Sequence, residues 1–290
     1  MNKAKFFSTL AILTMCICCV FVYNASAEIT NSIETIKSAQ TNKKADSTKS
    51  NKVLAKTKRP NKKGKGWFVN KKTGKKYYYL NGKKAKWFVK IKKKTYFFDK
   101  KGVMCKGWKR IKGKYYFLHN SKGYMLKNKK INLIQLSKKG PAKITKSNKE
   151  HMQTIMRAQA IYEKITKPNM SKKQKLKKCF DFALKYVQSS RRLWSKAYPY
   201  WYVDFANDMF VYGRGNCFSY AAAFGYLANA CGYKDVYIIS SGGHGWCEIG
   251  GYVYDLQQHG GKQGNMYKRS YDSLSSGYNQ CKRAYYVKLS

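Results

Sequence analysis

The chain has 290 residues, enough for about two domains, and its 43% hydrophobic and 16% aromatic content excludes a chain that is disordered throughout. Its formal net charge is +47, and residues 28–150 hold 38 of the 60 Lys and Arg residues. A field of this strength attracts polyanions, so nucleic acid, anionic membranes and acidic wall polymers all remain as partners until the compartment is known.

Residues 1–27 have the three parts of a secretory signal peptide. Lys3 and Lys5 precede an apolar run over residues 6–22, and the small residues Ala25-Ser26-Ala27 follow it. An uncleaved membrane anchor is the alternative, but the run barely reaches the ~20 residues that a bilayer needs. We expect cleavage after Ala27, and therefore a secreted protein with no integral membrane segment and no nucleic-acid partner.

Residues 28–63 are rich in Lys, Ser, Thr and Asn and almost free of aromatic residues. Such a segment buries too little apolar surface to offset its ordering entropy. We therefore expect a basic, disordered linker here.

Six of the nine cysteines lie beyond the signal peptide, without a CxxC pair or a regular spacing. A disulfide scaffold is therefore not indicated. These six cysteines are Cys105, Cys179, Cys217, Cys231, Cys247 and Cys281.

Residues 64–128 carry a repeat of about 20 residues. Trp67, Trp87 and Trp108 begin successive copies, and an aromatic triplet and then a glycine follow each of them. Each copy is typical of a β-hairpin. Because one hairpin alone is marginal in water, we expect the copies to stack into a small all-β array.

The third copy runs through Gly107-Trp108, Gly113-Lys114-Tyr115-Tyr116-Phe117 and Gly123-Tyr124-Met125. It resembles the choline-binding and glucan-binding cell-wall repeats of Gram-positive surface proteins. The resemblance implies aromatic cages for the choline of teichoic acid, or platforms for glucan, and so a wall-associated protein. The wall-ligand candidates are Trp67, Tyr78, Trp87, Tyr96, Trp108 and Tyr115.

Two observations complicate this interpretation of the repeats. The run Lys92-Lys93-Lys94 departs from the family pattern and favours the anionic backbone of a wall polymer, or glucan, over cationic choline. Each aromatic residue could also serve simply as the core of its own repeat.

The remaining chain predicts a connector over residues 129–148 and a globular domain over residues 149–290. Apolar periodicity predicts helices around residues 152–160 and after the cap Ser171, and a third over 217–230. Strand-like runs follow at residues 236–239, 245–249, 252–256 and 284–289. Helices first and strands afterwards predict an α+β domain with an antiparallel sheet.

Cys217 follows Gly213-Arg214-Gly215-Asn216 and opens the third predicted helix. A thiol at a helix N-terminus feels the positive end of the helix dipole, which favours the thiolate. His244 begins one predicted strand, and Asp255 lies on the next. If these strands pair, nucleophile, base and orienting carboxylate meet.

The order Cys217, His244, Asp255 resembles the transglutaminase-like core, which has a papain-like fold. Gly215-Asn216-Cys217, the strand His244-Gly245-Trp246-Cys247-Glu248 and the pair Tyr254-Asp255 carry the resemblance. It implies a thioester intermediate on Cys217 and catalysis without cofactor or metal. Leu256 follows Asp255 at a position where the family often has proline, and this departure weakens the assignment of Asp255 to the triad.

Three alternatives to the triad remain open. Asp235 could replace Asp255, and His259 lies near the motif, although it is more typical of a loop. A zinc site built from Cys217, Cys231, His244 and Cys247 fits no familiar spacing.

The sequence thus predicts a secreted, wall-associated thiol enzyme that acts on peptide or glutamine-type amide bonds, with a peptide or protein substrate. It leaves open whether water or an amine accepts the acyl group. The alternative is a non-catalytic wall-binding or adhesin protein that keeps a transglutaminase-like fold.

Overall fold

The computed structural model describes residues 64–189, 192–195 and 199–290. The predicted signal peptide and linker lie outside the described residues. The described part belongs to one compact unit, Thr57–Ser290. Within it, every helix is too short or too polar to cross a bilayer.

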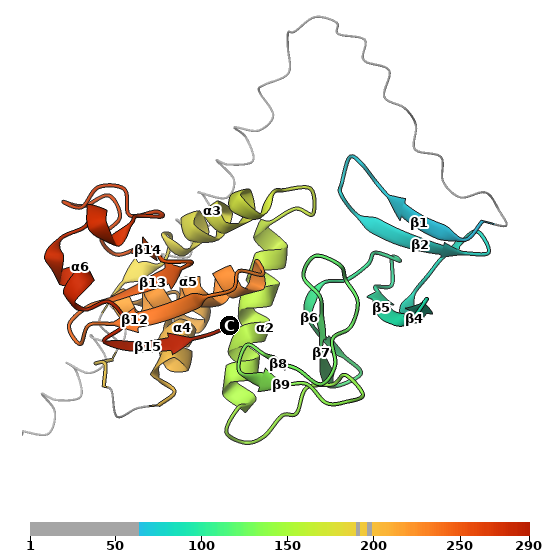
Figure 1. The fold of residues 1–290 in the computed structure, drawn as a ribbon, viewed down its shortest axis with the longest axis horizontal. Helices are drawn as coiled ribbons and strands as arrows, with labels where there is room; N and C mark the ends of the chain where they lie inside the picture. The colour runs from blue at the N-terminus through green and yellow to red at the C-terminus, as the bar shows by residue number, and fades with distance from the viewer. Residues whose placement is uncertain (1–63, 190–191, 196–198) are drawn as a thin grey trace, which may run out of the picture. The chain divides into compact units, whose positions relative to one another are not determined.

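The repeat region folds into antiparallel hairpins, as the sequence predicts (Figure 1). The first hairpin carries a short third strand, and its strands are β1 (Gly66–Val69), β2 (Lys76–Leu80) and β3 (Lys83–Lys84). The second and third hairpins are β4 (Trp87–Ile91) with β5 (Lys94–Phe98), and β6 (Gly107–Ile111) with β7 (Lys114–Leu118).

Two of the tight turns show why the repeat needs its glycines. Asn81 and Gly82 have φ of 48° and 71°, and Lys112 and Gly113 have φ of 48° and 77°. Positive φ at both central residues is the signature of the two-residue turn that matches strand twist, and glycine adopts it at the lowest cost.

The first two hairpins share a small core of their own, formed by Tyr78, Ala85, Ile91, Phe98 and Met104. The third hairpin belongs instead to the main core, because Trp108 and Phe117 lie there. The predicted connector also joins that core. It forms a further hairpin, β8 (Lys130–Ile131) and β9 (Ile134–Gln135), and its Ile134 is fully buried. Packing therefore continues across residue 128, where the sequence places a boundary.

The C-terminal part is α+β, as predicted. Its main helices are α2 (Lys149–Ile165), α3 (Lys172–Ala183), α4 (Trp201–Tyr212) and α5 (Cys217–Ala230). Its antiparallel sheet has the order β14 (Tyr252–Tyr254), β13 (Gly245–Ile249), β12 (Val236–Ser240) and β15 (Tyr285–Lys288). Smaller elements are the parallel pair β10 (Val187–Gln188) and β11 (Arg214–Gly215), the turn η1 (Tyr271–Ser273) and α6 (Ser276–Gln280).

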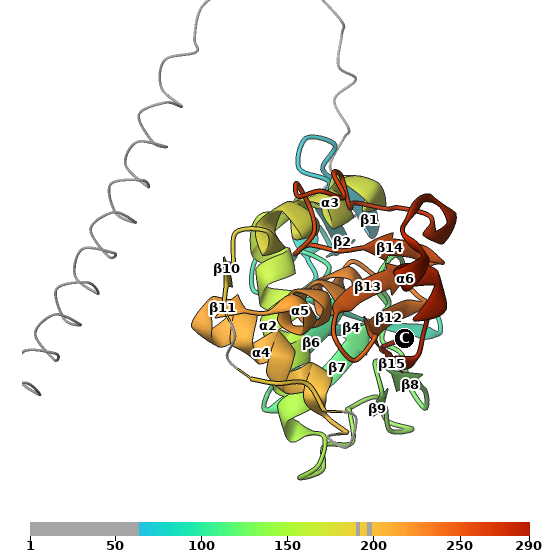
Figure 2. The ribbon, with the colours of Figure 1, turned by 90° about the vertical axis from the view of Figure 1, so that its left-hand side faces the viewer.

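Helix α5 is the centre of this part. It is buried almost along its whole length, contacts β12 and β13, and is surrounded by α2, α3 and α4 (Figure 2). Its many alanines allow that close approach, because a small side chain lets neighbouring backbones come near.

The structure confirms some of the helix predictions and departs from others. Ser171 and Gln174 form a capping box at the start of α3, which confirms Ser171 as the cap. On α2, Met152 and Ile155 are buried as expected, but Ala160 is exposed. Helix α4 was not predicted.

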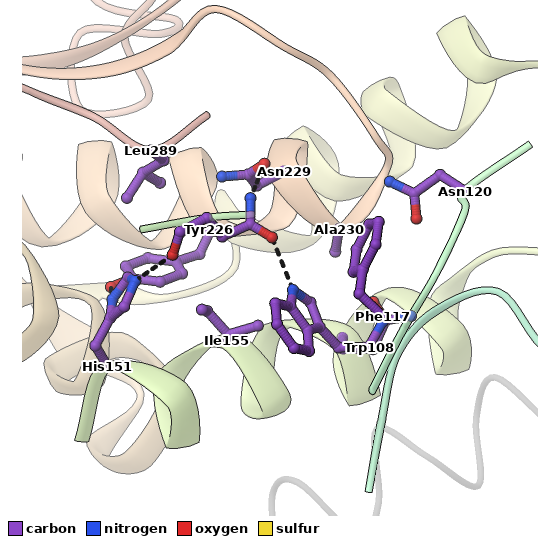
Figure 3. A pocket seen from close by; sticks show the side chains of 11 residues that line it. Trp108, Phe117, Asn120, His151, Ile155, Tyr226, Asn229, Ala230 and Leu289 are labelled. Atoms are coloured by element: carbon purple, nitrogen blue, oxygen red, sulfur yellow. Dashed lines mark hydrogen bonds between the residues drawn. The ribbon is translucent and has the colours of Figure 1, made fainter. Parts of the chain in front are cut away.

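A polar network joins the third and fourth hairpins to the helices (Figure 3). The indole N–H of Trp108 donates to Asn132 Oδ1 at 2.7 Å, and Asn132 Nδ2 donates to Asn229 Oδ1 at 2.7 Å. Buried His151 links the Tyr226 hydroxyl at 2.6 Å and the Asn132 carbonyl at 2.8 Å. Every one of these buried polar groups thus has a partner, which buried polar groups need.

Candidate functional site

Cys217 is the first residue of α5 and is nearly buried, at 7% exposure. Asn216 caps the helix, and its side-chain oxygen accepts from the Ser219 N–H at 3.4 Å. Gly215 is required by space, because a Cβ there would lie 2.3 Å from the Ser219 Cβ. The sequence around Cys217 therefore serves to turn the chain tightly into a capped helix that begins at the thiol.

His244 lies in the short turn between β12 and β13. The Ser241 hydroxyl accepts from the His244 N–H at 3.0 Å and donates to the His244 carbonyl at 3.1 Å. These two hydrogen bonds fix the backbone conformation of His244. The side chain remains 25% exposed, so it is partly open to solvent.

Asp255 follows β14 directly and is 1% exposed. Its Oδ2 lies 2.5 Å from His244 Nε2. The Tyr278 hydroxyl donates to the same oxygen at 2.6 Å, and the Gln258 N–H donates to Oδ1 at 3.1 Å. Both oxygens of the buried carboxylate are therefore satisfied, and the pairing of β13 with β14 brings Asp255 to the imidazole.

The Cys217 side chain also interacts with His244, since it helps to raise the pKa of the imidazole. Because Nε2 faces Asp255, Nδ1 is the ring nitrogen left for the thiol. Burial alone would lower the pKa of His244, but the hydrogen bonds and charges of Asp255 and Cys217 outweigh it and raise this pKa to about 10. The three residues selected from the sequence thus interact, with a hydrogen bond between His244 and Asp255 and an electrostatic interaction between His244 and Cys217, while their catalytic role stays a prediction.

A second buried carboxylate belongs to a hydrogen-bond network next to Tyr278 and Asp255. Glu248 is fully buried and accepts hydrogen bonds from Arg283 and, at 2.9 Å, from the Tyr271 hydroxyl. Trp246 donates to that hydroxyl at 3.0 Å, and its ring lies 5.0 Å from the Tyr278 ring. The network holds the aromatic residue that in turn holds Asp255.

Nothing in the sequence marks Tyr278 and Tyr271 as site residues. They lie in α6 and η1, two short elements between β14 and β15 where no motif or periodicity indicates a role. Burial, followed by the negative charge of Asp255, raises the pKa of Tyr278, so its hydroxyl keeps the proton that it donates.

The alternative site residues are placed elsewhere. Asp235 is paired with Lys288 at 2.8 Å, and His259 Nδ1 accepts from the Met266 N–H at 3.0 Å. Cys231 contacts Cys179, with 3.5 Å between their sulfur atoms. Among the described residues, no group of three or more His, Cys, Asp or Glu could hold a metal ion.

The structure divides the six wall-ligand candidates. Trp87 is 59% exposed and Trp67 36% exposed, whereas Tyr96 and Tyr115 are half-buried. Tyr78 and Trp108 are buried in the two cores, where their rings pack against other side chains, and their predicted ligand contact stays a prediction. Trp108 is covered because the helical domain packs on the third hairpin.

Trp67 and Tyr96 come from successive hairpins, and their ring centroids lie 5.1 Å apart. The ammonium group of Lys76 lies over one ring of this pair, because its Nζ is 4.3 Å from the Trp67 ring centroid. Lys94 similarly stands 4.4 Å from the Tyr124 ring. These faces are therefore suited to cations, as the resemblance implies.

Residues 88–129 match the family model described as choline-binding repeat. No curated protein matches the chain. Among solved structures, the chain is similar to choline binding protein F from Streptococcus pneumoniae, with 30% identity over 28% of each chain and a TM-score of 0.26.

Two further structures are similar over a comparable segment. The choline binding domain of a second Streptococcus pneumoniae protein is 24% identical over 28% of this chain and 95% of its own, with a TM-score of 0.26. Truncated alternansucrase from Leuconostoc mesenteroides is 28% identical over 27% of this chain and 7% of its own, with a TM-score of 0.23. The chain spans little more than a quarter of choline binding protein F.

Proposed function

We propose that this protein attaches to the cell wall through its hairpin repeats and acts there, through Cys217, as a thiol enzyme on peptide or glutamine-type amide bonds. The observation that carries the enzymatic part is the hydrogen bond between His244 and Asp255, together with the interaction of Cys217 with the same imidazole. The choline-binding repeat match supports the wall-binding part.

The chemistry follows from the roles that these groups can take. The sulfur of Cys217 attacks the amide carbonyl carbon, a C–S bond forms, and the C–N bond breaks as His244 protonates the leaving amine. Water or an amine then attacks the thioester, His244 accepts its proton, and the C–S bond breaks. The N–H of Cys217, in the first turn of α5, can stabilise the oxyanion.

The resemblance to the transglutaminase-like core gives this proposal its substrate class. The nucleophile at the start of an Ala-rich helix and the histidine at the head of a strand followed by the aspartate strand are the features that it shares. Tyr278 extends the pattern, because it holds the oxygen of Asp255 that faces the imidazole.

A second candidate function is a non-catalytic wall-binding protein. The repeat match favours it directly, because that match concerns binding alone and reaches only residues 88–129. Both candidates share the wall attachment, so the experiment has to concern the thiol.

The test is to incubate the full chain with a glutamine peptide and a fluorescent amine, and to follow amine incorporation and ammonia release together. Incorporation with ammonia release indicates transfer, and ammonia release alone indicates hydrolysis. Both signals should disappear in Cys217→Ala and persist in Cys105→Ala, a partly buried cysteine between the second and third hairpins. Absence of both signals in the wild type, with glutamine peptides and with wall peptides, would favour the non-catalytic candidate.

For the repeats, we expect choline to elute the protein from purified walls, and Trp67→Ala to weaken retention. The loss should be about tenfold, because a cation over an aromatic face contributes roughly 1–2 kcal/mol. Tyr252→Ala is the matched control, since Lys268 Nζ lies 4.6 Å from that ring outside the repeats. Elution by salt but not by choline would contradict the choline assignment and favour contact with an anionic polymer.

A further inference from the structure

A cavity of about 280 Å³ lies between the hairpins and the helices α2 and α3. Its walls come from the start of β2, the segment that leads into β6, and the turn between α2 and α3. Six lysines line it, namely Lys75, Lys76, Lys106, Lys109, Lys167 and Lys175. This volume is close to the lower end of the range typical of ligand pockets, which is about 300 Å³.

The two acids in the cavity wall already have hydrogen-bond partners. Asp99 Oδ1 accepts from the N–H groups of Lys101 and Val103, both at 2.8 Å, so this carboxylate stabilises the turn that follows it. Glu163 pairs with Lys109 at 2.6 Å and accepts from Gln159 at 2.6 Å. Of the six lysines, only Lys109 has an acidic partner among the described residues.

Three lysines without an acidic partner oppose one another, although Lys76 also contacts the Trp67 ring and Lys175 donates to the Pro168 carbonyl. Partial burial, and then the charges of Lys175 and Lys76, lower the pKa of Lys106. These three lysines come from three separate segments, so the fold converges positive charge on one space. Like charges brought together in this way are unfavourable until an anion enters.

The rest of the lining indicates what kind of anion fits. Tyr162, Pro168 and Met104 supply apolar surface beside the ammonium groups. A carbon skeleton that carries phosphates could use both, since the phosphate oxygens meet the lysines and the skeleton meets the apolar wall.

We propose that this cavity binds the phosphodiester backbone of a linear polyol-phosphate or sugar-phosphate polymer. The inference extends the proposed wall attachment, on which it rests for the source of the polymer, and does not depend on the thiol chemistry. It adds a second contact of opposite charge preference, because the aromatic faces suit cations whereas the cavity suits phosphates.

The test is binding of the full chain to poly(glycerol phosphate) that carries no choline. We expect Lys106→Gln/Lys175→Gln to raise the Kd about tenfold, at less than ~1 kcal/mol for each accessible charge pair. The control Lys138→Gln/Lys139→Gln removes the same charge from two exposed lysines outside the cavity and should change the Kd less than twofold. Equal losses in both variants would overturn the site in favour of diffuse attraction.

Two further arms separate the sources of phosphate. Inorganic phosphate that binds with the same lysine dependence while the polymer does not would overturn the polymer assignment. An oligonucleotide of equal charge that depends more strongly on Lys106 and Lys175 than the polymer does would overturn it as well.

Amine-reactive labelling of the unmutated protein keeps the site testable if the variants fold poorly. The polymer should protect Lys106 from the reagent and leave Lys138 labelled. Equal protection of the two lysines would count against the cavity. If the polymer fails to bind, the predicted elution of the protein by choline still stands, because this polymer carries no choline. The predicted amine incorporation still stands as well, because it depends on Cys217 and not on the cavity.

Discussion

The His244→Ala variant is expected to slow alkylation of Cys217 by iodoacetamide about 30-fold at pH 6, and to reduce acyl transfer ~10³-fold or more. A protonated imidazole beside the sulfur stabilises the thiolate, and the raised pKa of His244, about 10, keeps that proton in place at neutral pH. Without the imidazole, the thiol must ionise alone. Peptide mapping by mass spectrometry at Cys217 measures the rate.

The pH profile sharpens this prediction. In the wild type, the effect of His244 on Cys217 should change little between pH 6 and pH 8, because the imidazole, with its pKa raised to about 10, stays charged throughout that range. In His244→Ala the rate should rise steeply with pH, as it does for an ordinary thiol.

His259→Ala is the matched control, because that imidazole binds the Met266 N–H rather than the thiol. It should leave the rate at Cys217 unchanged. Equal rates in the wild type and His244→Ala would refute the pairing of Cys217 with His244 and leave the wall-binding protein as the better account.

The Trp108→Ala variant should lower the free energy of unfolding of the C-terminal part by about 3–5 kcal/mol. Trp108 is 2% exposed in the main core, and its indole N–H donates to Asn132 (Figure 3). The substitution removes a large buried ring and leaves Asn132 without that donor. Urea unfolding followed by near-ultraviolet circular dichroism measures the change.

Trp87→Ala provides the matched comparison, because Trp87 occupies the equivalent repeat position and is 59% exposed. Its cost should stay within about 0.5 kcal/mol, as for most surface substitutions. Similar costs at the two positions would mean that the third hairpin is not part of the main core.

The sequence was sufficient for the elements whose causes are local. Helix α5 begins and ends where predicted, because Asn216 caps it and Cys231 and Gly232 end it. The strands β12, β13, β14 and β15 follow the apolar runs closely. Cys217, His244 and Asp255 could be selected because each stands next to a helix or strand boundary that the pattern already defines.

Long-range packing accounts for what the sequence did not reveal. Trp67, Trp87 and Trp108 are equivalent in the repeat, yet only the third is covered by α2. Nothing local distinguishes it. Gly107 shows how closely β6 approaches α2, because a Cβ there would lie 2.5 Å from the Gln159 side-chain oxygen. Tyr278 likewise reaches Asp255 only through the folded chain.

The shared core of the third hairpin and α2 has a mechanical consequence. Since Trp108 and Phe117 lie in the same core as α5, this hairpin cannot swing independently of the helix that begins with Cys217. A wall polymer bound against the third hairpin would therefore lie at a fixed distance from Cys217, whereas the first two hairpins, which carry the exposed Trp67 and Trp87, have a core of their own. Only amide bonds at about that distance from the third hairpin would then be accessible to Cys217 from one anchoring point.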